Sequence, residues 1–235
     1  MLDAVAGSAI ANLDLPKVVL AVGSLGTAAY GLVDVTKGFG GGISNRGFGD
    51  IKKVVSKFIS AGENDGASAL SLSSALSTLR ANWLNGMALP DQKSIAKALI
   101  KLNLTNATAR RMAAVAGVNG ELLTSVADKL ASSAALTPQE TDVYGRFDLL
   151  LSSLLDQGYQ RADQRYRNSA KLAAVPVAVG LALLGAWAMA GSGLASAEVW
   201  RAIAGGLLAT PLAPVAKDLS SAIQAGAKVA QSWKR

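Results

Sequence analysis

Residues able to carry out chemistry are few in this sequence, and they do not form a motif. The chain has no histidine and no cysteine, which removes the commonest general base, the commonest metal ligand and all thiol chemistry. Asp, Glu, Lys and Tyr remain as bases, and a metal site would have only oxygen ligands. Because the carboxylates are scattered along the chain, we expect no catalytic residue, no metal site, no cofactor and no enzymatic activity.

A glycine-rich segment is the one place that suggests a phosphate-binding loop. Glycines cluster at 38–42 and again at 47–49. Neither GxxxxGK[ST] nor GxGxxG is present, and no strand pattern precedes the segment. We interpret it as a flexible turn, and nucleotide binding is not expected.

Basic residues suggest a different chemistry, the binding of anionic lipid. Residues 50–60 place apolar side chains at helical spacing, with lysines off that face. This pattern fits a helix lying on anionic headgroups, or a helix packed on its own domain with a solvated basic face. A second basic group, accompanied by Tyr159 and Tyr166, directly precedes a hydrophobic run, as at a headgroup boundary. The expected headgroup contacts are Lys52, Lys53, Lys57, Arg161, Arg165, Arg167 and Lys171.

A net charge of +7 would also suit nucleic acid. Three short helices predicted within 91–133 could resemble a helix-turn-helix unit. The last of them carries Glu121 and Asp128 beside Lys129, and these carboxylates repel phosphate. Nucleic-acid binding is therefore not expected.

The sequence also contains long apolar segments, which predict that the chain is embedded in a membrane. Only 17% of the chain is charged, against about 25% in soluble domains. Residues 172–216 contain two charges, Glu198 and Arg201, which divide the stretch into the arms of a membrane hairpin. Residues 18–33 form a further uncharged run. A signal peptide would need a positive start, whereas this start is acidic.

Small residues recur every four positions on the predicted membrane helices. Such stripes let helices approach closely, because packing drives helix association in lipid. The contacts could lie within the hairpin or between copies of the chain. The expected helix-packing residues are Gly23, Thr27, Gly31, Ala174, Ala178, Ala182, Ala186, Ala190, Gly205, Ala209 and Ala213.

Together these patterns predict an all-α integral membrane protein with about three transmembrane helices and a small helical cytoplasmic domain. Residues 1–37 hold the first membrane segment, and 38–66 a glycine-rich turn and basic interfacial helix. Residues 67–171 form the helical domain, which ends in a stalk helix opened by a capping box at Thr137–Glu140. Residues 172–216 form the hairpin, its third run shortened by Pro211 and Pro214. Residues 217–235 form a C-terminal amphipathic helix.

Lys and Arg flank one side of all three membrane runs. By the positive-inside rule the N-terminus is then outside, with the helical domain and C-terminus in the cytoplasm of a bacterial inner membrane. We expect a self-associating scaffold whose partners are the bilayer with its anionic headgroups and other copies of the chain. The alternatives are a channel or transporter subunit, or a membrane anchor for a cytoplasmic partner complex. No ionisable residue lies inside a membrane run, which disfavours transport unless hydroxyls such as Ser24, Thr27 and Thr210 line a pore.

Overall fold

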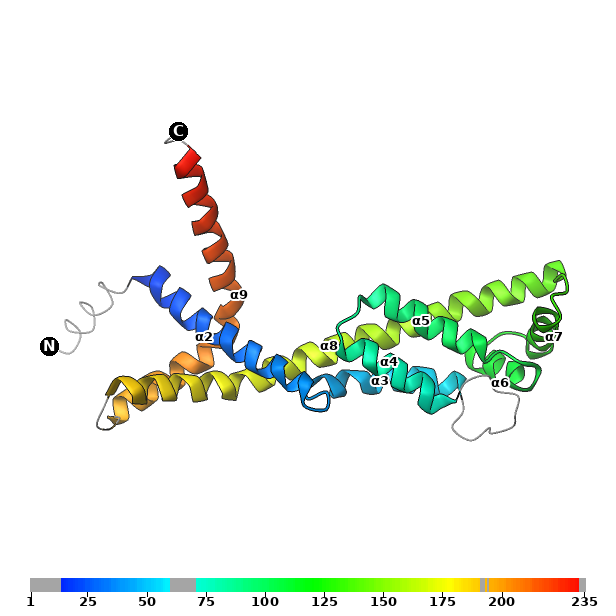
Figure 1. Cartoon of the computed structure of the whole chain (residues 1–235), viewed down its shortest axis with the longest axis horizontal. Coiled ribbons are helices and arrows are strands. Elements are labelled where there is room, and N and C mark those ends of the chain that lie inside the picture. Colours follow the sequence, from blue (N-terminus) through cyan, green and yellow to red (C-terminus); the bar gives the residue numbers. More distant parts are fainter. Residues whose placement is uncertain (1–13, 60–70, 191–192, 194, 233–235) are drawn as a thin grey trace. The chain divides into compact units, whose positions relative to one another are not determined.

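The computed structural model describes residues 14–59, 71–190, 193 and 195–232. Its secondary structure is 87% helical, and no strand occurs in the described ranges (Figure 1). The predicted all-α fold is confirmed. Within these ranges, three helices are long and apolar enough to cross a membrane, at Leu15–Gly38, Pro138–Ala190 and Ser196–Ala225.

The chain divides into two compact units. Unit 1 comprises Met1–Gly40 and Asn168–Arg235, and unit 2 comprises Gly41–Arg167. Helix α8, Pro138–Ala190, contributes its first part to unit 2 and its apolar last part to unit 1. It has 53 residues and passes through Pro176 without a break.

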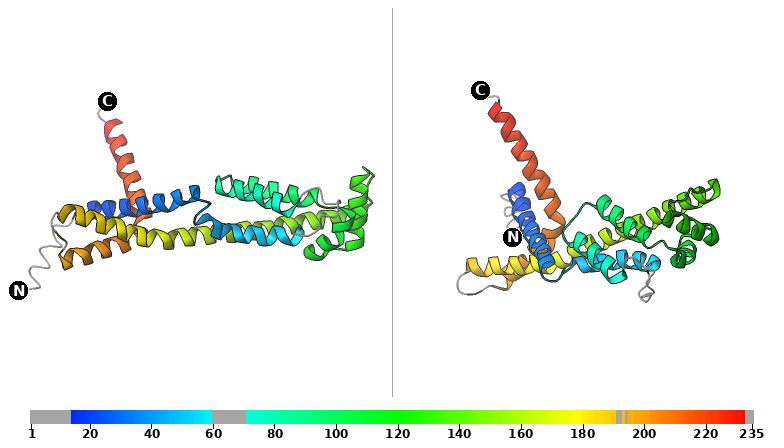
Figure 2. Two further views of the ribbon diagram at one scale, coloured as in Figure 1. Left: turned by 60° about the horizontal axis from the view of Figure 1, so that its bottom comes forward. Right: turned by 45° about the vertical axis from the view of Figure 1, so that its right-hand side comes forward.

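Unit 1 is built from α2, the last part of α8, and α9. Helix α2 spans Leu15–Val35 and is followed by the short 3-10 helix η1, Thr36–Gly38. Helix α9 spans Ser196–Ser232 and contains Pro211 and Pro214. We expected those prolines to end the third membrane run before a separate C-terminal helix, but α9 continues through both. Figure 2 shows the ribbon of α9 bending between its orange and red parts, as prolines inside a helix cause.

The described residues of unit 2 form five helices besides the first part of α8. Local signals in the sequence fix several of their ends. The side chain of Ser71 accepts a hydrogen bond from the Ser74 amide at the start of α4, and Asn119 does the same for two amides at the start of α7. Gly117 closes α6 with φ of 70°, a left-handed conformation that favours glycine. The five helices are α3 Ser44–Phe58, α4 Leu72–Leu84, α5 Leu89–Leu102, α6 Asn106–Ala116 and α7 Gly120–Ala131.

The core of unit 2 is closed and apolar. Phe58 of α3 and Phe147 of α8 are fully buried and meet edge to face, with ring centroids 6.4 Å apart. Each of the other helices adds at least one fully buried side chain, because its apolar positions recur on one face. These side chains are Leu79, Ile100, Met112 and Leu123.

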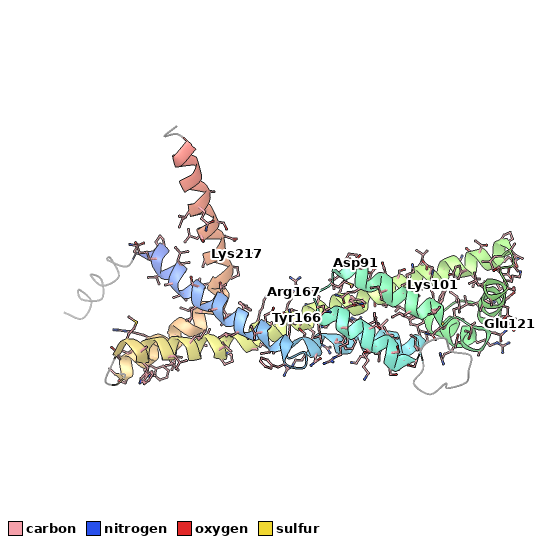
Figure 3. All side chains as sticks on the ribbon, in the orientation of Figure 1. Asp91, Lys101, Glu121, Tyr166, Arg167 and Lys217 are labelled. Carbon is pink, nitrogen blue, oxygen red and sulfur yellow. The ribbon has the colours of Figure 1, made fainter. Side chains whose placement is uncertain are left out.

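An ionic seam joins α5 to α8 along the outside of this core. Lys93, Lys97 and Lys101 recur every fourth residue and therefore share one face of α5. Lys93 pairs with Asp156, and both Lys97 and Lys101 pair with Asp148. Lys101, labelled in Figure 3, also lies over the ring of Tyr144 at 4.9 Å. The carboxylates sit two helical turns apart, matching the spacing of the lysines.

Candidate functional site

Two glycines bring α2 into backbone contact with α9. A Cβ atom at Gly23 would lie 2.1 Å from the Cβ of Ala216, and one at Gly26 would lie 2.1 Å from the carbonyl oxygen of Ala209. Real carbon contacts are about 3.5 Å or longer, so any side chain at either position would push the helices apart. The contact point moves back along α9 as it moves forward along α2, from Ala216 to Ala209. Along this contact the helices run antiparallel.

A third glycine brings α9 against α8. A Cβ at Gly206 would lie 2.5 Å from the Cα and 2.8 Å from the nitrogen of Val179. The neighbouring Gly205 has no atom within 4 Å of such a position. Gly206 is therefore the position at which these two backbones approach, as small residues allow in membrane helices.

Only part of the predicted stripe on α2 faces another helix of the chain. Gly23 is buried, whereas Thr27 and Gly31 are exposed. The face that α2 buries is instead Gly23, Gly26, Ala29 and Val33. Its members are three, three and four residues apart. A helix of 3.6 residues per turn keeps such a mixture of spacings on one face, whereas positions exactly four residues apart gradually rotate away from that face. The signal that could have identified Gly26 was its i+3 position after Gly23.

The stripes on α8 and α9 are covered to different degrees. Ala174 and Ala178 are fully buried, and Ala209 and Ala213 are buried as well. Gly205 is only half-buried and meets nothing, while its neighbour makes the contact. The remaining positions on α8 are half-buried. They are Ala182, Ala186 and Ala190.

The basic helix α3 packs on its own domain, which is one of the two interpretations left open by its sequence. Its apolar face is buried in unit 2, with Ile51 and Val55 at 1% and 0% exposure. That face is therefore not available to insert into a bilayer. The lysines on the other side are exposed and face solvent. They are Lys52, Lys53 and Lys57.

The arginines that precede the membrane part of α8 are all exposed, but two have acidic partners. Arg165 pairs with the buried carboxylate of Asp50 on α3 at 3.2 Å, and Arg167 pairs with Asp163 at 2.8 Å. Arg161 and Lys171 are exposed. Arg165 therefore joins two helices of unit 2 in addition to presenting charge outward.

The two tyrosines of this segment were expected at a headgroup boundary, and the structure corrects that expectation. Tyr159 is 1% exposed, and its hydroxyl donates to the carbonyl oxygen of Gln92 at 3.3 Å. The ring of Tyr166, labelled in Figure 3, packs edge to face on Trp83 with centroids 6.3 Å apart. Gly47 makes room for this pair, since a Cβ there would lie 2.8 Å from Trp83. Both tyrosines belong to the packing of unit 2.

The predicted capping box at the start of α8 is confirmed. The Thr137 amide donates to Oε2 of Glu140 at 2.7 Å, and the Glu140 amide donates to Oγ1 of Thr137 at 3.3 Å. Lys129 and Ser125 of α7 also donate to Glu140, at 2.7 and 2.6 Å. The hydrogen bond from Lys129, followed by those from Ser125 and Thr137, lowers the pKa of Glu140 from 4.5 to about 2. Through the hydrogen bonds from Lys129 and Ser125, the capping residue Glu140 also links α7 to α8.

Asp148 in the ionic seam is held in its charged form by two lysines. Burial by itself raises the pKa of Asp148, but hydrogen bonds and charge from Lys101 and Lys97 outweigh it, so the net shift is downward. Burial by itself lowers the pKa of Lys101, but hydrogen bonds and charge from Asp148 and Tyr144 together outweigh it, so the net shift is upward. In the described part of the chain no three acidic side chains gather where a metal ion could be held.

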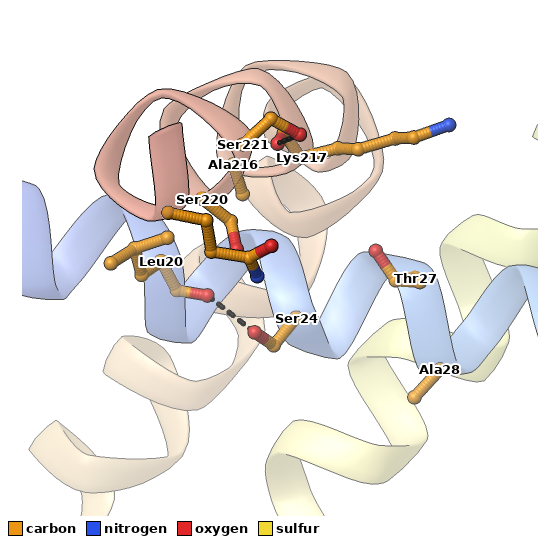
Figure 4. Close-up of a pocket in the computed structure, with 9 residues that line it drawn as sticks. Leu20, Ser24, Thr27, Ala28, Ala216, Lys217, Ser220 and Ser221 are labelled. Atoms are coloured by element: carbon orange, nitrogen blue, oxygen red, sulfur yellow. Dashed lines mark hydrogen bonds between the residues drawn. The ribbon is translucent and has the colours of Figure 1, made fainter. Parts of the chain in front are cut away.

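A groove, which we call the α2–α9 groove, lies between α2 and α9. It brings together Ser24 and Thr27, two of the hydroxyls considered as pore-lining residues (Figure 4). The third, Thr210, is buried outside the groove, and its hydroxyl has no hydrogen-bond partner. The sequence pattern did not indicate the groove, because its two walls are nearly 200 residues apart.

Comparison with known proteins identifies no relative of this chain. No protein-family model matches the sequence, and neither curated proteins nor solved structures contain a match to it.

Proposed function

We propose that the protein is a membrane-anchored scaffold, with unit 1 in the bilayer and unit 2 as a helical module at the membrane surface. The observation that carries this proposal is the apolar surface of unit 1. Met189 is 90% exposed, Leu172 72% and Trp200 70%. Leaving such side chains in water costs about 25 cal/mol for each Å² of apolar surface, whereas hydrocarbon solvates them. Further exposed apolar side chains of unit 1 are Leu15, Leu32, Val35, Leu184, Trp187, Leu207, Leu208 and Ile223.

The contrast with unit 2 supports this assignment. The apolar residues of unit 2 form a core that its own helices close, with Phe58, Phe147 and Leu151 fully buried. The chain buries the apolar side chains of unit 2 and leaves those of unit 1 exposed. This contrast supports different surroundings for the two units, water for unit 2 and hydrocarbon for unit 1. The charges follow the same division, since the last part of α8, from Leu172 to Ala190, carries none.

Basic residues support an orientation in which unit 2 is cytoplasmic and the N-terminus is outside an inner membrane. Lys37 and Arg46 follow α2, and Arg165, Arg167 and Lys171 precede the membrane part of α8. Both connections to unit 2 are thus positive, as cytoplasmic flanks are. Three straight crossings, however, would make α2 and α9 parallel, and their contact is antiparallel. We therefore infer that only the part of α9 before the prolines acts as a third membrane segment.

Self-association is supported by small residues that the single chain leaves uncovered. Gly31 lies on the exposed side of α2, where an added Cβ would meet no atom within 4 Å, and Ala186 and Ala190 on α8 are half-buried. In lipid, close packing of such faces is a main source of helix association. Unit 2 would then be displayed in several copies on a membrane surface, held near anionic headgroups by Lys52, Lys53 and Lys57.

Carbonate extraction followed by crosslinking in native membranes tests the proposal. The expected result is a membrane pellet that resists carbonate and a ladder ending at a discrete oligomer. Extraction of the chain into water without detergent would contradict the membrane assignment, and a monomer at all crosslinker concentrations would contradict the scaffold.

Orientation can be tested directly because the chain has no cysteine. Exposed Asp91 in unit 2 and Ser196 at the start of α9 are suitable positions for single cysteines. We expect an impermeant thiol reagent applied from outside to label S196C and not D91C. The reverse pattern would overturn the orientation.

The channel alternative is favoured by one observation, the hydroxyls of the α2–α9 groove. Ion flux in liposomes containing the purified chain would support it against the scaffold. Stable copurification of one soluble protein with a monomeric chain would instead support an anchor for a partner complex.

A further inference from the structure

The positive charge of unit 2 is concentrated on α3 and on the part of α8 that packs against it. Residues 44–58 and 157–167 carry seven basic and two acidic residues, whereas the rest of unit 2 carries eight basic and nine acidic residues. Figure 2 shows α3 running alongside α8. These two segments therefore account for the net positive charge of the whole unit.

Close contacts hold the two segments side by side. A Cβ atom at Gly47 would lie 2.5 Å from the carbonyl oxygen of Ala162, and one at Gly158 would lie 2.8 Å from Cγ2 of Val54. The contact point moves back along α8 as it moves forward along α3. The helices are therefore antiparallel, and the exposed residues along their contact form one continuous surface.

Basic residues border this contact on the side away from the core. Arg46 and Lys53 are seven residues apart, and Lys53 and Lys57 are four apart, so the three share one stripe of α3. Asp50 lies between them and pairs with Arg165 at 3.2 Å, which places the stripe beside α8. A further arginine of α8 lies one turn before Arg165. The α3–α8 basic surface, as we call it, comprises Arg46, Lys53, Lys57, Arg161 and Arg165.

Most of the charge on the α3–α8 basic surface is not neutralised by the chain itself. Arg165 pairs with Asp50. In the part of the chain that the structure describes, no ion pair involves Arg46, Lys53, Lys57 or Arg161. All four side chains are exposed. Their charges are therefore available to a polyanion.

The types of the exposed side chains indicate which polyanion fits. Within α3 and residues 157–167, all of which the structure describes, the exposed residues are the seven basic ones and four amides, and none is apolar. A protein partner would need apolar or aromatic anchors. A lipid-binding amphipathic helix would need a free apolar face, and α3 buries that face in the core. Arg, Lys, Gln and Asn are the side chains that contact the phosphates and sugars of nucleic acids. The amides are Asn45, Gln157, Gln160 and Gln164.

The aromatic residues of this region distinguish a duplex from a single strand. Proteins that bind single strands stack the bases on exposed aromatic rings. Tyr159 is 1% exposed, and the ring of Tyr166 packs on Trp83. The α3–α8 basic surface therefore offers charge and hydrogen bonds without a ring for stacking, as the backbone of a duplex requires.

We propose that the α3–α8 basic surface binds the phosphate backbone of a nucleic-acid duplex without reading its sequence. The sequence did not lead us to expect nucleic-acid binding, because Glu121 and Asp128 lie on the last of the short helices within 91–133. The surface lies on other helices. The proposal goes beyond the scaffold function and does not depend on it, since every residue of the surface belongs to unit 2.

The test measures binding of a short fluorescent DNA duplex to the full chain in nanodiscs of phosphatidylcholine, which has no net charge. Fluorescence anisotropy gives the affinity over a series of salt concentrations. The four available cations predict a slope of about −4 for the logarithm of the binding constant against that of the salt concentration, because each phosphate contact contributes about −0.9. Absence of binding at about 50 mM salt, or an affinity that salt does not change, would contradict the proposal.

Variants separate this surface from diffuse attraction to a basic protein. K53Q on α3 and R161Q on α8 are each expected to weaken binding about tenfold at about 50 mM salt and to reduce the slope by about 1. The matched control is R110Q, which removes an exposed charge from α6. Its side chain lies toward α7, 3.7 Å from the Cβ position of Gly120, and its loss should change the affinity little. Equal effects of the three variants would overturn the proposal.

Anionic lipid is the competing polyanion, since Lys53 and Lys57 are also proposed above to lie near headgroups. An amine reagent, read by mass spectrometry, reports the exposure of each lysine. We expect the duplex to protect Lys53 and Lys57 in phosphatidylcholine nanodiscs. Protection by phosphatidylglycerol in the nanodisc, with none by the duplex, would assign the surface to headgroups and overturn the proposal. Circular dichroism confirms that each variant is folded before its affinity is compared.

Discussion

Two adjacent glycines on α9 allow the packing of unit 1 to be tested with a built-in control. Replacing Gly206 by alanine would place a Cβ 2.5 Å from the Cα of Val179, whereas the same change at Gly205 meets no atom within 4 Å. The two variants have identical composition and differ by one position in the same helix. Their difference therefore measures the contact between α9 and α8.

The size of this difference follows from the geometry. Carbon atoms in contact lie about 3.5–4.0 Å apart, so the new methyl group at position 206 is about 1 Å too close. The obstacle is backbone, which cannot rotate away, and the two helices must separate. Overpacking of this kind costs about 1–3 kcal/mol. The gain of about 1 kcal/mol in helix propensity from Gly to Ala is common to both variants and cancels.

Unfolding in detergent, followed by helical circular dichroism during titration with a denaturing detergent, provides the assay. G205A is expected to be at least as stable as the parent chain. G206A is expected to be less stable than G205A by about 1–3 kcal/mol. Adding V179A removes the Cγ2 contact at 2.9 Å but not the backbone atoms, so it should not restore the stability of G206A.

Equal stabilities of the two variants would refute the reasoning. The glycines of α9 would then reflect only a composition rich in small residues, and the close backbone contact of α9 with α8 at Gly206 would lose its main support. Full rescue by V179A would show instead that side chains, not backbones, set the distance between the helices.

Three further predictions concern unit 2. The pKa of Glu140 is lowered in the folded chain to about 2, so its stabilisation is complete above about pH 5 and is lost as the pH falls toward 2. E140Q should flatten that part of an acid-unfolding curve, and an unchanged curve would contradict the shift. D148N should destabilise unit 2 by about 1–2 kcal/mol, and less at high salt, because it weakens two half-buried ion pairs; D142N, at an exposed pair, should change little. F147A should cost about 3–5 kcal/mol in chemical denaturation, against less than about 0.5 kcal/mol for L149A at a position 71% exposed.

Local sequence patterns determined much of the secondary structure. The capping box at Thr137–Glu140 placed the start of α8 because its two reciprocal hydrogen bonds involve only residues three apart. No strong stop signal follows the capping box in the sequence, and α8 continues as far as Ala190. The uncharged runs identified the membrane-compatible helices because the hydrophobic effect depends on composition, whatever the partners.

Only the tertiary structure decided which face of each helix contacts which neighbouring helix. Gly26 and Gly206 were not singled out, and Gly31 was, because a stripe of small residues shows that a close contact is allowed without showing where its partner lies. The same reason applies to α3, whose amphipathic pattern fits a bilayer or a protein core equally well. The burial of Ile51, Val55 and Phe58 in the structure assigns it to the core.

The basic and aromatic residues before the apolar run of α8 also separate what the sequence determines from what the fold determines. The sequence by itself determined their number, their charge and their position next to an apolar helix. The fold decided that Arg165 pairs with Asp50 and that Tyr159 is buried. Charge acts over distances longer than a side chain and can be inferred from the sequence. Hydrogen bonds and packing require contact between residues far apart in the sequence, such as Tyr159 and Gln92, which are 67 positions apart.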